Sequence, residues 1–200
     1  MIGNDIVDLK LAAVQSNWKR KGFLDKIFTN KEQDLILNAK DPSIMVWLLW
    51  SMKESAYKIY MRQNSLRIFA PKRFECDVNT SQNTVKINEI LYFTSSTISK
   101  DSIHTIARLN LNTSIRTNYF KMKNDSYTIQ HNTTYNSLKE GVTQQFDIPI
   151  SKIEINKNKM GIPYINELSK VSISISHHGI FGAYAFEFIE PCKEYKILWV

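Results

Sequence analysis

The sequence predicts an α+β fold in which an antiparallel sheet packs on one long central helix. Residues 43–62 contain neither Gly nor Pro and place apolar side chains on one broad side of a helix, which predicts the central helix. From Phe74 onward, apolar and polar residues alternate as they do in half-buried strands. No repeat or low-complexity linker divides the 200 residues, of which 43% are hydrophobic, so we expect a single domain over residues 1–200.

The first part of the chain is predicted to form one strand and several helices. These are a strand at 2–9, helical segments at 10–18 and 23–28, and a helix that starts at Thr29 or Asn30 and ends at Asp41-Pro42. The start of that last helix is predicted from a capping pair, because Glu32 or Gln33 lies three residues beyond the cap. The central helix then follows from Ser43.

The rest of the chain is predicted to be mostly β-structure. The expected elements are strands at 84–93, 103–111 and 125–130, a helix at 136–145, a hairpin from 153–155 and 164–165, and a final hairpin from 171–176 and 182–189. In the final hairpin, Val171, Ile173 and Ile175 alternate with serines, so one face is predicted to be apolar and the other polar.

Charge and hydropathy limit the possible partners. The formal net charge of +7 indicates an anionic partner, such as a nucleic acid, a membrane surface, an acidic protein or a phosphorylated small molecule. No standard nucleic-acid-binding motif is present, so we expect no nucleic acid. The longest strongly apolar run, residues 44–50, is far shorter than the roughly 20 residues that cross a bilayer, so we expect no membrane.

Cysteine content and the first residues indicate the compartment. Cys76 and Cys192 are too few for a disulfide framework and lack the spacing of a zinc site. Residues 1–9 contain polar and acidic side chains in place of a basic start and an apolar run, so they are not typical of a signal peptide. We therefore expect a cytoplasmic protein.

Two short motifs carry residues suited to binding a magnesium ion and a pyrophosphate. Gly3-Asn4-Asp5-Ile6-Val7-Asp8 supplies two carboxylates, and Trp50-Ser51-Met52-Lys53-Glu54-Ser55-Ala56-Tyr57-Lys58 supplies a third beside two lysines. Mg²⁺ prefers oxygen ligands from a few carboxylates and from substrate phosphates. The two motifs together therefore predict a metal and phosphate site.

Each motif also has a simpler explanation. Asp5 and Asp8 are residue types common in turns. Glu54 and Lys58 are four residues apart on a helix, where a surface ion pair contributes only about 0.2–0.5 kcal/mol. Lys53 and the aromatic flank favour a cleft instead, where unliganded charges are costly.

A third motif completes a resemblance to a known family. Ser174-Ile175-Ser176-His177 is followed by Ala183-Tyr184-Ala185 on the returning strand. In this order the three motifs resemble those of the 4′-phosphopantetheinyl transferase superfamily, and most closely the holo-acyl-carrier-protein synthases. The resemblance covers about residues 1–65 and 147–190, and it implies that residues at about 66–146 form a long β-rich insertion in that fold.

The resemblance implies an activity and a set of site residues. The family moves the 4′-phosphopantetheine arm of coenzyme A onto a serine of an acyl or peptidyl carrier protein, with Mg²⁺, and releases adenosine 3′,5′-bisphosphate. Asp5, Asp8 and Glu54 would bind the metal. Glu54, or a water that it orients, would act as the base, and Lys58 would stabilise or protonate the leaving phosphate.

Further residues are assigned to coenzyme A by the same resemblance. Lys53 would clamp phosphate beside Lys58, and Ser176 and His177 would contact the phosphates of the nucleotide. A lone His at a strand end is more often a satisfied polar residue than a ligand, and the Ser-x-Ser-His context favours the ligand. His178 would be a bystander in the same turn.

The carrier protein and the oligomeric state remain open at this stage. Lys19, Arg20 and Lys21 form a basic cluster that would dock an acidic carrier or be an ordinary solvated face. The related short synthases form trimers with sites at subunit interfaces, so a monomer and a homotrimer are both expected alternatives. One departure from the family is Ile162, which stands at the lysine position of its Gly-Lys-Pro turn.

Two other functions fit the same motifs. A catalytically silent relative would bind a carrier protein or coenzyme A as an interaction module. A metal-dependent phosphohydrolase would release pantetheine phosphate without any acceptor. The intact acids favour the transferase over the silent module.

Overall fold

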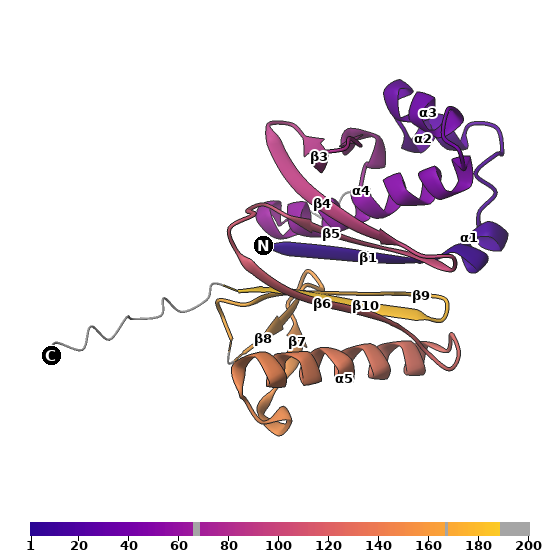
Figure 1. Cartoon of the computed structure of the whole chain (residues 1–200). Coiled ribbons are helices and arrows are strands. Elements are labelled where there is room, and N and C mark those ends of the chain that lie inside the picture. The colour runs from indigo at the N-terminus through magenta and orange to yellow at the C-terminus, as the bar shows by residue number, and fades with distance from the viewer. Residues whose placement is uncertain (66–68, 167, 189–200) are drawn as a thin grey trace, which may run out of the picture.

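Two antiparallel sheets lie face to face, and each is covered on its outer side by one long helix (Figure 1). The computed structural model describes residues 1–65, 69–166 and 168–188. The first sheet has the strand order β1-β5-β4-β3-β2 and lies against α4. Its elements are β1 (Ile2–Asp8), β2 (Glu75–Asp77), β3 (Asn83–Ile87), β4 (Ile90–Ile98), β5 (Ser102–Arg108) and α4 (Pro42–Asn64).

The second sheet and its helix form the other half of the structure. The strand order is β6-β10-β9, and α5 covers the face turned away from the first sheet. The elements are β6 (Ser114–Lys121), α5 (Tyr127–Phe146), β9 (Ser172–His178), β10 (Phe181–Phe188) and the small pair of β7 (Ile155–Lys157) with β8 (Pro163–Ile165). The predicted α+β class, with an antiparallel sheet packed on a long central helix, is therefore confirmed.

Three short helices precede α4. They are α1 (Leu9–Gln15), α2 (Phe23–Ile27) and α3 (Asn30–Leu37). Thr29 caps α3 in a capping box with Glu32, as the sequence predicted. None of the helices in the described residues is long and apolar enough to span a bilayer.

The central helix begins one residue earlier than predicted. Asp41 is its N-cap and accepts a hydrogen bond from the Ile44 amide at 3.1 Å, while Pro42 occupies the first helical position. Pro suits that position because its missing N–H would have no partner there. The Asp-Pro pair therefore starts α4, whereas α3 already ends at Leu37.

A close approach between β1 and α4 sets the position of the first motif. A Cβ atom on Gly3 would lie 2.0 Å from the Ser55 carbonyl oxygen, so only glycine allows the strand to sit this close to the helix. The Ser55 hydroxyl also donates to the Thr105 carbonyl of β5 at 3.1 Å. Residues on this face of β1, Asp5 among them, therefore lie directly against α4.

The other face of β1 meets β9 through side chains. The amides of Ile2 and Asn4 donate to the hydroxyls of Ser172 and Ser174, at 3.2 and 2.9 Å. The amide of Asp8 donates to His178 Nδ1 at 2.9 Å. The polar face of the Ser-x-Ser repeat thus satisfies backbone donors of an edge strand that has no strand partner on that side.

Several predicted strands differ from the structure. Residues 125–130, predicted as a strand, run into α5, whose buried residues Thr134, Leu138 and Val142 recur every four positions. The predicted strand 84–93 is a hairpin, because Asn88 adopts the left-handed φ of 52° between β3 and β4. β6 was not predicted, since it is half-exposed and carries no clean alternation.

Two expectations concern the chain as a whole. Residues 66–146 supply most of the first sheet, β6 and the whole of α5, and their description as an insertion stays a prediction. Of the two cysteines, Cys76 is buried and free, whereas Cys192 and the last residue of the predicted strand 182–189 lie outside the described residues.

A buried ion pair connects α3 with α4. Lys53 Nζ donates to both carboxylate oxygens of Glu32, at 2.7 and 2.9 Å, and the two side chains are 0% and 1% exposed. Lys53 also donates to the carbonyls of Pro71 and Phe74, and Glu32 accepts from the Cys76 amide. All charges in this cluster are compensated inside the protein.

Replacing Lys53 should therefore destabilise the fold. Lys53→Met leaves the Glu32 carboxylate buried without its cation, and we expect a loss of about 3–5 kcal/mol in the free energy of unfolding. Lys31→Met is the matched control, because Lys31 pairs with Asp77 at 2.9 Å at the exposed surface, where such pairs contribute at most about 1 kcal/mol. Urea unfolding of both variants checks the prediction, and equal losses would contradict it.

Candidate active site

A cavity of about 270 Å³ lies where β1, α1, α4 and the end of β9 meet. Its lining includes Asp5, Glu54, Trp47, Trp50, His177 and His178. The first and second motifs therefore meet in one hollow, and the end of the third motif lies beside them. These segments are far apart in the sequence, so the cavity depends on the tertiary fold.

Asp5 and Glu54 are the acidic residues of this cavity, and Lys58 lies beside Asp5. Lys58 Nζ lies 3.7 Å from Asp5 Oδ1, and Glu54 lies one helical turn before Lys58 on α4. Lys58 also donates to the backbone carbonyl of Asn4, which fixes the ammonium group beside β1. One cation therefore lies beside two carboxylates in a largely buried place.

Burial changes the acidity of both carboxyl groups. It raises the pKa of Asp5, against the opposing charge of Lys58. Burial, and then the charge of Asp5, raise the pKa of Glu54 to about 7, while Lys58 lowers it. The single positive charge of Lys58 therefore does not offset the burial of these two carboxyl groups.

This shortage fits a divalent cation. Mg²⁺ is commonly held by one or two carboxylates and completes its shell with water and substrate phosphates. Within residues 1–65, 69–166 and 168–188, no three acidic, His or Cys side chains are arranged to hold one ion. Asp5 and Glu54 are the two carboxyl groups that line this cavity.

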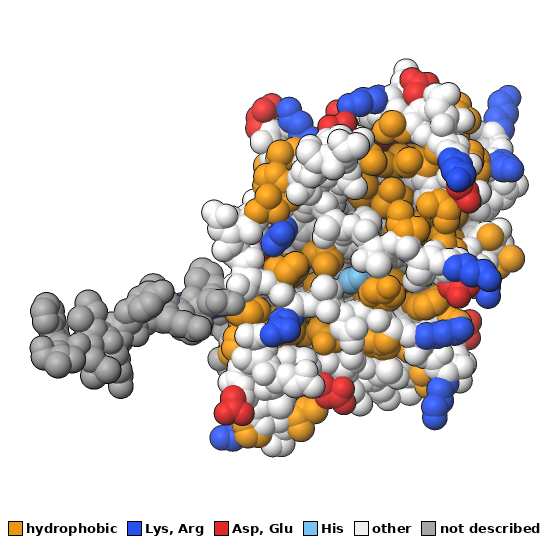
Figure 2. All heavy atoms as spheres, viewed as in Figure 1, with side chains coloured by type: hydrophobic (Ala, Val, Ile, Leu, Met, Phe, Trp, Pro, Cys, Tyr) orange, Lys and Arg blue, Asp and Glu red, His pale blue; other side chains and the backbone are white. Residues whose placement is uncertain are grey.

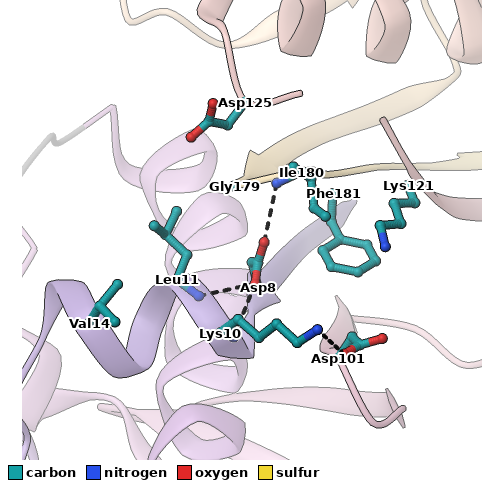
Figure 3. A pocket seen from close by; sticks show the side chains of 10 residues that line it. All are labelled: Asp8, Lys10, Leu11, Val14, Asp101, Lys121, Asp125, Gly179, Ile180 and Phe181. Carbon is teal, nitrogen blue, oxygen red and sulfur yellow. Dashed lines mark hydrogen bonds and ion pairs between the residues drawn. The ribbon is translucent and has the colours of Figure 1, made fainter. Parts of the chain in front are cut away.

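Asp8 has other partners. Its Oδ1 accepts from the amides of Lys10 and Leu11 at 3.1 Å, which caps α1, and its Oδ2 accepts from the Ile180 amide at 3.2 Å (Figure 3). It lines a separate, mostly apolar cavity of about 320 Å³ on the other side of α1. The structure does not bring Asp8 to the cavity of Asp5 and Glu54.

Lys53 is also directed away from the cavity. It is fully buried, and its ammonium group is held by Glu32 and two carbonyls. Lys53 and Glu54 are adjacent in sequence, but successive helical residues point in directions about 100° apart. The predicted phosphate clamp therefore has no access to a ligand here, and Lys53 is a residue of the core.

Ser176 and His177, at the end of β9, lie in different surroundings. Ser176 accepts a hydrogen bond from Asn4 Nδ2 at 3.1 Å and is 8% exposed, so it belongs to the contact between β1 and β9. His177 is exposed and lines the cavity. Burial of its ring, followed by the charge of Lys58, lowers the pKa of His177.

His178, expected to be a bystander, connects three elements. Its Nδ1 accepts from the Asp8 amide, so the proton resides on Nε2, which lies 3.2 Å from Gln15 Oε1 and donates to it. His178 thereby joins β9 to β1 and α1. Burial lowers its pKa, against the opposing charges of Asp5 and Asp8.

The sequence did not predict a buried pair of polar side chains, Asn4 and His104, near Lys58. Asn4 is fully buried, and its amide Nδ2 lies 3.4 Å from His104 Nε2 on β5. Burial and the charge of Lys58 lower the pKa of His104 to about 4, so its imidazole is neutral at pH 7. Nothing in the sequence marks His104, because it occupies an ordinary position in an alternating strand.

The basic cluster of Lys19, Arg20 and Lys21 lies outside the cavity. All three side chains are exposed, between α1 and α2. The Lys19 ammonium lies 5.4 Å from the Trp18 ring centre. Figure 2 shows basic side chains along the margin of the molecule that carries α1, with acidic ones among them.

Comparison with protein-family models agrees with the motifs. The structure resembles the crystal structure of Thermotoga maritima holo-[acyl-carrier-protein] synthase, with a TM-score of 0.43 and 11% identity, over 84% of this chain and 86% of that chain. No curated protein matches the sequence. The family model of the 4′-phosphopantetheinyl transferase superfamily matches residues 1–114, which is more than half of the 200 residues. The chain therefore belongs to the 4′-phosphopantetheinyl transferase superfamily.

Proposed function

We propose that this protein transfers the 4′-phosphopantetheine arm of coenzyme A to a serine of an acyl or peptidyl carrier protein, with Mg²⁺. Adenosine 3′,5′-bisphosphate is the other product. The observation that carries the proposal is the meeting of Asp5 and Glu54 at one cavity, with Lys58 paired to Asp5, in a chain of the transferase superfamily.

Asp5 and Glu54 would hold the metal ion. Their raised pKa values mark a place where positive charge is missing. When bound, Mg²⁺ would supply positive charge to the pyrophosphate oxygens as negative charge grows on them. Asp8 and Lys53 are left out of this assignment because both have complete sets of partners elsewhere.

The reaction exchanges one P–O bond for another. The carrier serine oxygen bonds to the β-phosphorus of coenzyme A, the phosphoanhydride bond breaks, and the leaving phosphate keeps the electron pair. The serine proton goes to Glu54, or to a water that Glu54 orients. A carboxylate oxygen that binds the metal is not free to accept a proton. Glu54 would therefore use one carboxylate oxygen for the metal and the other for the proton.

Lys58 and His177 would bind phosphate oxygens. The Asn4 carbonyl fixes the Lys58 ammonium next to Asp5, so its charge is in place before the substrate arrives. His177 lines the same cavity and can donate a hydrogen bond to a phosphate. Ser176 accepts from Asn4 and keeps its own O–H to donate.

The exposed cluster of Lys19, Arg20 and Lys21 would attract an acidic carrier protein. Charges at a rim mainly accelerate encounter, so their loss should slow association more than it weakens the final complex. The cluster lies beside α1, whose residues Ala12 and Gln15 line the cavity. A carrier docked there would have its serine near the acids.

An interaction module without catalysis is the second candidate. It is favoured by Ile162, because the lysine typical of the related turn is absent. Calorimetric titration with coenzyme A separates the two functions. Binding that requires Mg²⁺ supports the enzyme, whereas equal binding with and without Mg²⁺ supports the module.

Replacing Glu54 should abolish transfer. Glu54→Gln keeps the shape of the side chain but removes a metal ligand and the base, so we expect a loss of at least about 10²-fold in rate. The assay is intact mass spectrometry of a panel of apo carrier proteins with coenzyme A and Mg²⁺. Glu89→Gln, on a side chain that is 96% exposed, is the control and should transfer normally. Normal transfer by Glu54→Gln would refute the assignment.

Glu54 should also make stability depend on pH. Its pKa is 4.5 when unperturbed and about 7 in the fold, so the folded state binds the proton more tightly. The free energy of unfolding should therefore fall as the pH rises from 4.5 to 7, and this group contributes up to about 3 kcal/mol of that fall. Urea unfolding at pH 5 and pH 8 with a chelator measures this fall. Glu54→Gln should reduce it, and an identical fall in the variant would be inconsistent with a buried Glu54.

The oligomeric state can be tested by dilution. The proposed metal ligands Asp5 and Glu54 both belong to the same chain, and we expect a monomer to carry out transfer. Light scattering after gel filtration gives the mass, and the specific activity should stay constant over a range of dilutions. Activity that falls with dilution in step with dissociation of a trimer would instead place part of the site on a neighbouring chain.

A further inference from the structure

A column of aromatic rings runs along one face of α5. Tyr127, His131 and Tyr135 are spaced four residues apart and so lie above one another on the helix. The ring centres of His131 and Tyr135 are 4.0 Å apart with an interplanar angle of 23°, and those of Tyr127 and His131 are 6.0 Å apart at 34°. Lys157 lies 5.9 Å from the centre of the Tyr135 ring and ends the column.

Packing of the neighbouring face of α5 holds this column beside β9. Gln130 Nε2 donates to the Gly179 carbonyl at 2.8 Å, in the turn between β9 and β10. Thr134 is fully buried, and a Cβ atom on Gly182 would lie 2.6 Å from its hydroxyl oxygen. The helix is thus fixed against the strands that carry His177.

Tyr127 and His177 form a corner at the N-terminal end of α5, where the column begins. Their ring centres are 6.2 Å apart and the rings are nearly perpendicular, at 77°. Tyr127 is 68% exposed, which is unusual for so large a ring. The rings behind it restrict its motion, so a ligand that stacks on Tyr127 would lose little additional side-chain freedom.

Two lysines and two further imidazoles lie near this corner. The charges that act on His177 come from Lys58, His131, Lys157 and His178, all of which are bases. An exposed aromatic face among basic groups is the combination that proteins use to bind a nucleobase and its phosphate together. His177 is part of both this corner and the cavity that contains Asp5 and Glu54.

We propose that the corner of Tyr127 and His177 is the site for the purine ring of the nucleotide substrate. The base stacks on Tyr127, and a phosphate on the adjoining ribose lies toward His177 and Lys157. This assignment rests on the proposed function, in which the nucleotide is the adenosine end of coenzyme A. His177 then stands between the base and the pyrophosphate, which matches the order of these groups in the substrate.

Alanine substitution at Tyr127 tests the stacking. Adenosine 3′,5′-bisphosphate is titrated into the full chain by calorimetry, and base stacking on an aromatic ring is worth about 1–3 kcal/mol, so Tyr127→Ala should weaken binding about 5- to 150-fold. Tyr127→Phe keeps the ring and should bind like the wild type. Tyr164→Ala, on a tyrosine of β8 that is 42% exposed, is the matched control and should have no effect.

A second probe separates the base from the phosphates. Phosphopantetheine has no purine, so its affinity should be the same for the wild type and for Tyr127→Ala. If Tyr127→Ala bound adenosine 3′,5′-bisphosphate as tightly as the wild type, or if Tyr127→Phe lost as much affinity as Tyr127→Ala, the stacking site would be refuted. Transfer activity in the wild type would then still support the proposed function. A wild type that neither binds coenzyme A nor transfers its arm would refute both.

Discussion

The backbone contact between Gly3 and Ser55 is the constraint on which the candidate site depends. Because no side chain fits there, β1 lies directly on α4, and Asp5 is placed two residues further along the strand, against the helix that carries Glu54 and Lys58. A strand a few ångströms further out would separate the carboxylates and let water screen them. The raised pKa of Glu54 is a direct consequence of this close packing.

The two faces of β1 contact different elements. Odd-numbered residues such as Asp5 meet α4, whereas Asn4 and its even-numbered neighbours meet the serines of β9. The Asn4 carbonyl holds Lys58 while its side chain holds Ser176, so the charged group on α4 and the end of β9 are connected through a single residue. Phosphoryl transfer depends on positioning, and in the proposed function a few hydrogen bonds between buried groups would provide it.

The hydrophobic patterns predicted the elements whose period is strong and uninterrupted. The central helix, the first strand and the final hairpin are confirmed: α4 buries a broad apolar side, and β1 and β10 are buried along nearly their whole length. The start of α5 was predicted as a strand because its first residues, 127–130, are β-branched or aromatic and polar, and only the packing of Thr134, Leu138 and Val142 extends the helix back to them. That error also concealed the aromatic column, whose four-residue spacing is evident only on a helix.

The sequence by itself determined which chemistry is available: two acidic motifs, their order along the chain and the family to which they belong. It did not determine which of several similar side chains face a ligand. Lys53 and Lys58 are both lysines beside Glu54, yet one is sealed against Glu32 and the other lies against Asp5. Asp5 and Asp8 are likewise both acids of one strand, but Asp8 caps a helix. These choices depend on where α3, α1 and β9 pack, because contacts between distant segments decide which charges are neutralised inside the protein and which remain for a substrate.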